Sequence, residues 1–247
     1  MNKLPAVTAA FWVMKICATT LGETAGDLLS MTLDVGYAAS SLILLTVFAV
    51  TLAAQLAAKR YNPFLYWTVI LSTSTAGTTM SDYMDRTLGL GYATGSLVLV
   101  SLLLAIFALW RVTTGSLSVD RIASVETEAL YWTAILFSNT LGTALGDFLA
   151  DDSGLGFAGG AALIASALAL VLLAHRFTSL SKVLLFWTAF VLTRPFGATL
   201  GDALTKPVDH GGLNLGTIGS SLVLLAILVG VIVHTSRRER AREPTPA

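Results

Sequence analysis

Charged residues and cysteines are both scarce in this sequence. Asp, Glu, Lys and Arg make up 12% of its 247 residues, whereas soluble domains carry about 25%. This scarcity excludes a soluble globular domain, a disordered chain and a nucleic-acid-binding protein. The lone Cys17 excludes a disulfide framework and a cysteine-based metal site. Because 15 acidic residues balance 15 basic ones, the net charge of zero says nothing about binding partners.

Apolar residues, in contrast, are abundant: 55% of the chain is hydrophobic and its mean hydropathy is +0.76. A membrane-spanning helix needs about 20 mostly apolar residues. Four uncharged stretches meet this requirement, at 37–58, 92–110, 155–174 and 213–233. Four more polar stretches alternate with them, at 8–30, 64–84, 129–150 and 184–204, and each contains a carboxylate. The sequence therefore predicts an all-α transmembrane protein of eight helices.

Basic residues are sorted to one side of these spans. The hairpins on the other side hold only Arg86 and Lys206, beside Asp34, Asp85, Asp151, Asp152 and Asp209. The flanks on the side of the termini hold Lys3, Lys59, Arg60, Arg111, Arg121, Arg176, Lys182, Arg237, Arg238, Arg240 and Arg242. Since Lys and Arg concentrate in cytoplasmic loops, we expect a bacterial cytoplasmic (inner) membrane protein with both termini in the cytoplasm.

One hairpin recurs four times along the chain. Each copy opens with an aromatic-Trp pair, followed ten residues after the Trp by a glycine and fifteen residues after it by an aspartate. The pairs are Phe11-Trp12, Tyr66-Trp67, Tyr131-Trp132 and Phe186-Trp187; the glycines are Gly22, Gly77, Gly142 and Gly197; the aspartates are Asp27, Asp82, Asp147 and Asp202. The fourth hairpin contains an insertion around Lys206 to His210.

We place the copies at residues 6–60, 61–115, 126–178 and 181–235 of a single transmembrane domain spanning 1–235. The polar segment 236–247 is expected to be a disordered cytoplasmic tail. Four tandem two-span repeats with this signature resemble a bacterial membrane-protein family known by its "repeat of unknown function", whose members are labelled uncharacterised membrane-anchored proteins. The resemblance covers residues 6–234. It implies the eight-span topology and brings no established activity or site residues.

The repeat constrains the geometry. Because each copy has two spans, all four enter the membrane in the same direction and are related by an axis along the membrane normal. The four aspartates then lie at nearly one depth, about 22 Å beyond the Trp residues. We expect a pseudo-fourfold ring of the polar helices with a carboxylate cluster near its outer end and the apolar helices outside. The aromatic-Trp pairs are expected to anchor the helices at the interface.

Steps of four residues back from each aspartate stay on one helical face. These faces read Lys15, Thr19, Glu23, Asp27; Ile70, Ser74, Thr78, Asp82; Ile135, Asn139, Thr143, Asp147; and Phe190, Arg194, Ala198, Asp202. They must point inward, because a charge facing lipid costs about 2.5–3.5 kcal/mol on insertion scales. Small residues spaced four apart, such as Gly22 and Gly26, permit either close helix approach or local unwinding that frees carbonyl ligands. In the fourth copy, Pro195 predicts a kink.

Intramembrane acids mark ion or proton sites by default, and the five acids on these faces outnumber the bases Lys15 and Arg194 by three. We therefore expect a cation transporter or channel rather than an enzyme. The expected ligands are Asp27, Asp82, Asp147, Asp202 and Glu23. Oxygen ligands suit Mn²⁺, Mg²⁺ or Ca²⁺, and the thioethers of Met80 and Met84 beside Asp82 favour Mn²⁺.

Coupling or gating is expected of Lys15, Arg194, Asn139, Thr78 and Thr143, with protons exchanged through Glu23 and Lys15. The apolar Ile70, Ile135 and Phe190 are expected to form a gate. The expected partners are the lipid bilayer, an inorganic cation and protons, with a homo-oligomer as a further option, and no nucleic acid. Transport direction, oligomeric state and the choice between channel and carrier stay open.

Two other functions fit the residues. The first is an intramembrane aspartyl-type hydrolase, in which two carboxylates share a proton. An even ring of four aspartates and the lack of a Gly-x-Gly-Asp motif argue against it. The second is a non-transporting membrane scaffold or sensor, which predicts that the aspartates can be neutralised without effect provided that Lys15 and Arg194 are neutralised with them.

Overall fold

The computed structural model describes residues 4–122 and 124–242, and every regular element in this part of the chain is a helix. Four long helices carry the polar faces: α1 (Ala9–Asp27), α3 (Pro63–Asp82), α5 (Val125–Asp147) and α7 (Lys182–Thr205). Four apolar helices alternate with them: α2 (Tyr37–Ala57), α4 (Tyr92–Thr114), α6 (Gly156–Phe177) and α8 (Thr217–Arg242). The predicted eight-helix fold is confirmed.

Short helical turns connect some of these elements. Directly after the aspartates of the first three copies come three π-helical turns, η1 (Leu28–Thr32), η2 (Tyr83–Thr87) and η4 (Phe148–Asp152). The 3₁₀ turns η3 (Val119–Arg121) and η5 (Val208–His210) lie in the α4–α5 and α7–α8 connections. The polar helices are α-helical through all their glycines. The sequence left open whether these helices unwind at the glycines; they do not, and the wider π turns lie beyond the aspartates.

Each polar helix begins at a residue that caps it. The side chains of Thr8, Asn62, Ser124 and Ser181 accept hydrogen bonds from the backbone N–H three residues further on. Such caps satisfy an N–H group that has no partner inside the helix. Proline at the first position of α3, Pro63, supports the same start because its missing N–H is not needed there.

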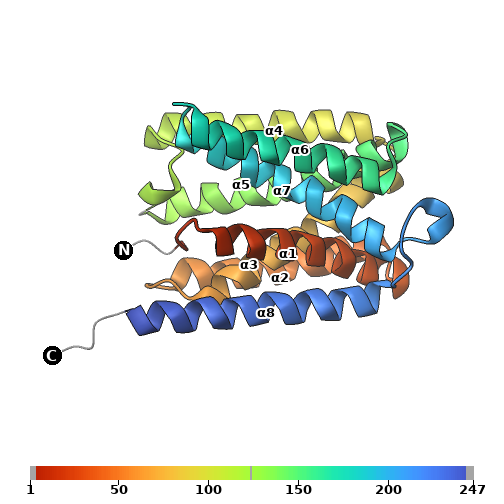
Figure 1. The fold of residues 1–247 in the computed structure, drawn as a ribbon, viewed down its shortest axis with the longest axis horizontal. Helices are drawn as coiled ribbons and strands as arrows, with labels where there is room; N and C mark the ends of the chain where they lie inside the picture. Colours follow the sequence, from red (N-terminus) through yellow and green to blue (C-terminus); the bar gives the residue numbers. More distant parts are fainter. Residues whose placement is uncertain (1–3, 123, 243–247) are drawn as a thin grey trace.

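The polar helices form a closed ring in which α1 packs on α3, α3 on α5, α5 on α7 and α7 on α1. Each apolar helix packs mainly against the polar helix of the following copy: α2 on α3, α4 on α5, α6 on α7 and α8 on α1 (Figure 1). The last helix therefore closes the cycle onto the first. This arrangement confirms the prediction of parallel repeats around a common axis.

The two ends of the bundle differ. The start of α1 and the end of α8 lie at the same end, which we call the terminal end (Figure 1). The connections α1–α2, α3–α4, α5–α6 and α7–α8 turn at the opposite end, which we call the hairpin end. The α7–α8 connection projects further than the others in this view.

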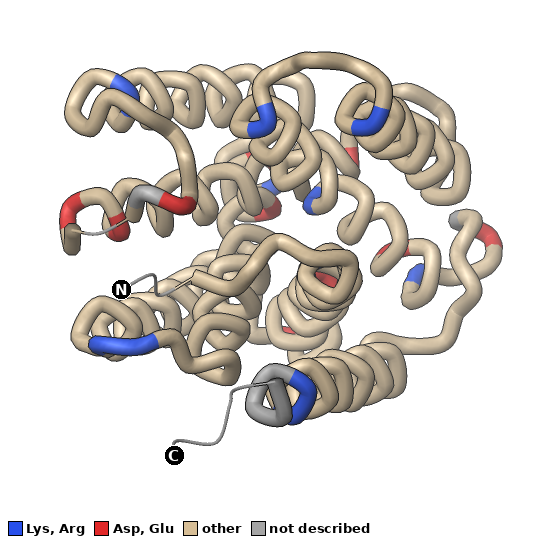
Figure 2. The backbone as a smooth tube through the Cα atoms, turned by 60° about the vertical axis from the view of Figure 1, so that its left-hand side comes forward, with Lys and Arg blue, Asp and Glu red and all other residues tan. Residues whose placement is uncertain are grey.

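The distribution of polarity is the reverse of that in a soluble protein. Large apolar side chains are exposed on the outer helices, for example Leu42 at 70% and Leu97 at 67%, whereas Lys15 and Arg194 are 0% exposed. In Figure 2 charged residues lie inside the bundle and at its ends, and the outer helices carry few of them along their lengths. Five described helices, α2, α4, α6, α7 and α8, are long and apolar enough to cross a membrane. An outward apolar surface of this kind is typical of a protein that lies in a lipid bilayer.

The predicted disordered tail was wrong for residues Ser236 to Arg242, which continue α8. Arg, Glu and Ala, which make up most of this segment, are good helix formers. Residues 243–247 lie outside the described part of the chain.

Candidate functional site

The glycine ten residues after each Trp is where neighbouring ring helices touch. A Cβ atom at Gly22 would collide with Ser74, at Gly77 with Asn139, at Gly142 with Arg194 and at Gly197 with Thr19. These four partners occupy the same position in the next copy, so one contact repeats around the whole ring. Of the two roles considered for the glycines, the structure shows close helix approach.

Four layers of side chains follow one another along the ring, in steps of four residues. From the terminal end they are Lys15, Ile70, Ile135 and Phe190; Thr19, Ser74, Asn139 and Arg194; Glu23, Thr78, Thr143 and Ala198; and Asp27, Asp82, Asp147 and Asp202. None of these side chains belongs to a residue more than 3% exposed. The predicted inward orientation of the polar faces is confirmed.

Arg194 joins all four ring helices. Its Nη1 donates to Glu23 Oε2 of α1 at 2.8 Å. Its Nη2 donates to the hydroxyls of Thr78 on α3 at 2.6 Å and Thr143 on α5 at 2.7 Å. Both hydroxyls also lie within 3.3 Å of Glu23 Oε2. Three residues predicted from sequence to act in gating thus surround the one glutamate of the predicted ligand set.

Lys15 lies one layer away from this cluster, towards the terminal end. Its Nζ donates to Asn139 Oδ1 at 3.3 Å and lies 4.2 Å from the centroid of the Phe190 ring. Asn139 in turn donates to Thr73 Oγ1 at 2.9 Å. The partners found for Lys15 are therefore an amide and an aromatic face, which attracts a cation through its quadrupole.

The four aspartates form two pairs, and a base from a hairpin binds each pair. Lys206 Nζ lies 2.6 Å from Asp27 Oδ2 and 3.2 Å from Asp202 Oδ1. Arg86 Nε lies 3.1 Å from Asp82 Oδ1, and Arg86 Nη2 lies 3.3 Å from Asp147 Oδ2. The sequence interpretation placed both bases on hairpins and did not connect them with the ring. The available signal was their position four residues after Asp82 and Asp202, a spacing that brings side chains together on a helix.

Both hairpin bases are charged. Burial alone would lower the pKa of Lys206, but the carboxylates of Asp202 and Asp27 raise it above the usual lysine range. Burial likewise opposes ionisation of Arg86, and Asp82 and Asp147 raise its pKa. Five carboxylates therefore face three ion-paired bases, Arg86, Arg194 and Lys206, within the described residues. These ion-paired bases leave two carboxylate charges unmatched, whereas the three inferred from sequence came from counting Lys15 and Arg194 as the bases.

A subset of the predicted ligands converges closely. Glu23, Asp147 and Asp202 each offer one carboxylate oxygen, and these atoms lie within 4.8 Å of one another. All three residues are buried, and they come from α1, α5 and α7. Asp27 and Asp82 belong to the same ring but not to this group.

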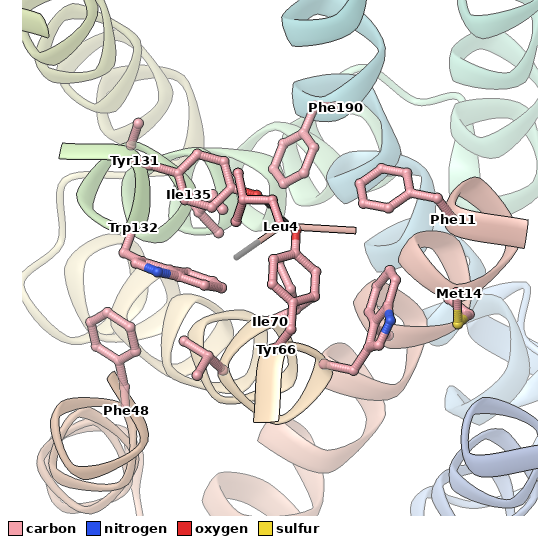
Figure 3. Close-up of a cluster of buried hydrophobic side chains, with 14 of the residues drawn as sticks. Leu4, Phe11, Met14, Phe48, Tyr66, Ile70, Tyr131, Trp132, Ile135 and Phe190 are labelled. Carbon is pink, nitrogen blue, oxygen red and sulfur yellow. Dashed lines mark hydrogen bonds between the residues drawn. The ribbon is translucent and has the colours of Figure 1, made fainter. Parts of the chain in front are cut away.

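The terminal end of the axis is filled by aromatic and aliphatic side chains (Figure 3). Tyr66, Trp67, Tyr131 and Trp132 are at most 1% exposed, and the hydroxyls of the two tyrosines lie 2.7 Å apart. Leu4 lies among these rings and is 9% exposed. Interface anchoring was therefore the wrong interpretation of these two aromatic-Trp pairs. They fill the space between the ring helices where these helices begin (Figure 3).

A ring of polar helices enclosing ion-paired carboxylates, with an apolar outer surface, defines a helical membrane protein built from four repeats. The model of the Repeat of Unknown Function (DUF347) family matches residues 10–61, 65–116, 130–181 and 185–241, and the chain belongs to this family. These bounds lie close to those predicted from the aromatic-Trp, glycine and aspartate spacing. No curated protein and no solved structure matches the chain.

Proposed function

We propose that this protein is a cation transporter of the bacterial cytoplasmic membrane, with a divalent metal such as Mn²⁺ as its substrate. The observation that carries the proposal is the convergence of Glu23, Asp147 and Asp202, whose carboxylate oxygens lie within 4.8 Å of one another in a buried ring. Three oxygens from three helices are a ligand set that Mn²⁺, Mg²⁺ or Ca²⁺ can use.

The charge balance supports a cation rather than a structural role. Two carboxylate charges stay unmatched by the ion-paired bases of the described ring. Unmatched charge at such a depth is expensive, and helix association does not require it because the glycine contacts already hold the ring together. A bound divalent cation would offset this charge.

The closed axis favours a carrier over an open channel. Ile70, Ile135 and Phe190 are fully buried at the terminal end of the axis. Closer to the hairpin end, Arg194 and Glu23 bridge the ring helices. Passage of a cation therefore requires these helices to move, with Arg194, Thr78, Thr143, Asn139 and Lys15 rearranging. We assign proton exchange to Glu23 and Lys15 and place the termini in the cytoplasm on the basis of the Lys and Arg distribution.

Ion flux in liposomes tests the proposal. We expect Mn²⁺ flux with the wild-type protein and its loss in D27N/D82N/D147N/D202N, provided that this variant still elutes as a folded protein. The matched control is D151N/D152N, because these two aspartates are exposed on η4. Thermal stabilisation of the purified protein by MnCl₂, MgCl₂, CaCl₂, KCl and NaCl would identify the cation class. Unchanged flux in the ring variant contradicts the proposal.

The hydrolase alternative gains no support from the contacts. An aspartyl hydrolase needs two carboxylates that share one proton, whereas each ring aspartate in the described structure lies within 3.3 Å of a basic nitrogen.

A further inference from the structure

We infer that Lys206 is a tethered competitor of the transported cation: its ammonium group occupies the carboxylates of Asp27 and Asp202 in the empty site and leaves when a divalent cation binds. This inference rests on the proposed function and concerns the same ring. In this role Lys206 sets the affinity of the ring for the transported cation and its selectivity for divalent over monovalent cations.

Lys206 is held less firmly than Arg86, the other base of the aspartate ring. Arg86 contacts two carboxylates, donates to the Tyr37 hydroxyl at 3.2 Å and lies over the rings of Tyr37 and Tyr92. The Nζ atom of Lys206 contacts two carboxylates, and its only other hydrogen-bonding partner among the described residues is the sulfur of Met31 at 3.8 Å. A guanidinium makes several directional bonds from a rigid fork, whereas an ammonium is a compact charge on a flexible stem.

The position of Lys206 in the fold allows it to move. The residue caps the end of α7 in an extended conformation and begins the longer fourth hairpin, which projects from the hairpin end of the bundle (Figure 1). Its side chain is 20% exposed and that of Arg86 is 30% exposed, whereas that of Arg194 is fully buried. The corresponding residues in the first and third copies are Met31 and Asp151, which cannot compete with a cation. Lys206 and Arg86 therefore both bind ring aspartates and reach solvent, but two tyrosines also hold Arg86, so Lys206 is the one of the two that can leave more readily.

Replacement of the Lys206 ammonium group by a cation favours a divalent over a monovalent cation. Departure of Lys206 releases Asp202, one of the three carboxylates that converge within 4.8 Å. A divalent cation that replaces the ammonium group lowers the unmatched negative charge from two to one. A monovalent cation leaves that charge unchanged and loses the hydrogen bonds of the ammonium group, so it gains nothing from the exchange.

Chemical labelling of the wild-type protein tests the movement directly. An amine-acetylating reagent is added to purified protein with MnCl₂, with NaCl of equal ionic strength or with neither, and acetylation of each lysine is measured by mass spectrometry. We expect MnCl₂ to increase labelling of Lys206 several-fold and NaCl to leave it unchanged. Lys182, exposed at the start of α7, is the internal control.

The outcomes separate this inference from the proposed function. Stabilisation by MnCl₂ with unchanged or reduced labelling of Lys206 overturns the role of Lys206 alone. If no cation of the panel stabilises the protein, the proposed function is overturned and the inference with it. Because this experiment uses the wild-type chain, the folding of a variant does not affect it.

Replacement of the ammonium group provides a second test. We expect K206M to bind Mn²⁺ at least about tenfold more tightly than the wild type, since a neighbouring charge in a partly buried site is worth more than 1.4 kcal/mol. NaCl should now stabilise K206M although it does not stabilise the wild type. K206R keeps the charge and can hold both carboxylates through its fork of N–H groups, so it should bind Mn²⁺ no more tightly than the wild type. Equal or weaker Mn²⁺ affinity in folded K206M overturns the inference.

Discussion

At the scale of single residues, Arg194 holds the centre of the molecule together. It is completely buried and bonds to residues of the other three ring helices. A buried ion pair adds little net stability compared with an apolar pair of similar volume, but removal of one partner leaves an uncompensated charge. Arg194 and Glu23 are therefore best understood as a pair whose members depend on each other.

We predict that R194M destabilises the folded protein by roughly 3–5 kcal/mol, because Glu23 then lacks its partner. The double variant R194M/E23Q should recover a large part of this loss. Unfolding in mixed detergent micelles, followed by circular dichroism, measures both values. A double variant as unstable as R194M alone would show that the pair is not the source of the effect.

Asp85 on η2 should make stability depend on pH. The residue is 5% exposed; Ser81 donates to its Oδ2 at 3.3 Å, and its Oδ1 has no hydrogen-bond partner among the described residues. Burial raises the pKa of Asp85 to about 6, although Ser81 and Arg86 oppose the rise. The unfolded value is about 3.9. The folded state thus binds the proton more tightly, and its stability falls as pH rises from about 4 through 6.

D85N should abolish this dependence because an amide does not ionise. We expect the variant to exceed the wild type by roughly 1–2 kcal/mol at pH 7.5, allowing for solvent screening, and to equal it near pH 4. Thermal melting across this pH range measures the difference, with D152N as the exposed control on η4. Parallel pH profiles for the wild type and D85N would contradict the assignment.

At the scale of elements, the glycines set how closely neighbouring ring helices pack. A Cβ at Gly77 would lie 2.9 Å from backbone atoms of Asn139 and Thr140, which cannot rotate away. We predict that G77A separates α3 from α5 and destabilises the protein by about 1–3 kcal/mol. In G230A the new methyl group meets nothing within 4 Å, so this change in α8 should be neutral or slightly stabilising. Equal melting temperatures for the two variants would contradict the packing argument.

The arrangement of the helices was largely predictable from sequence, whereas two sets of contacts between them were not. The spacing of the aromatic-Trp pairs, Gly22 and its equivalents, and Asp27 and its equivalents predicted the ring, because a helical repeat fixes which residues share a face. The contact of Arg86 with Asp147 was missed, because it crosses from one copy to the next and depends on the π turn that carries Arg86. The burial of Tyr66 and Tyr131 was missed because an aromatic pair at a helix start fits an interface and a core equally well.

At the scale of the whole molecule, the repeats are interlocked rather than merely adjacent. Each outer helix packs on the ring helix of the next copy, so the ring closes where α7 packs on α1 and the outer layer closes where α8 packs on α1. The chain order alone left this closure undetermined, because α8 could have packed on its own copy. Because α7 packs on α1, the fourth copy lies beside the first, and Lys206 of the fourth hairpin reaches Asp27 of α1.

The only cysteine of the sequence makes this closure testable. Cys17 on α1 lies with its sulfur 3.2 Å from the backbone oxygen of Leu224 on α8. Mild oxidation of L224C should therefore form a disulfide between residues 17 and 224 and yield a faster-migrating monomer in denaturing electrophoresis without reductant. L222C is the matched control, because Leu222 is 63% exposed on the outer surface of the same helix. A crosslinked dimer of L224C would show that α8 packs on α1 of a second chain. Absence of both the intramolecular and the intermolecular crosslink would contradict the packing of α8 on α1, which places the Cys17 sulfur beside the backbone of residue 224.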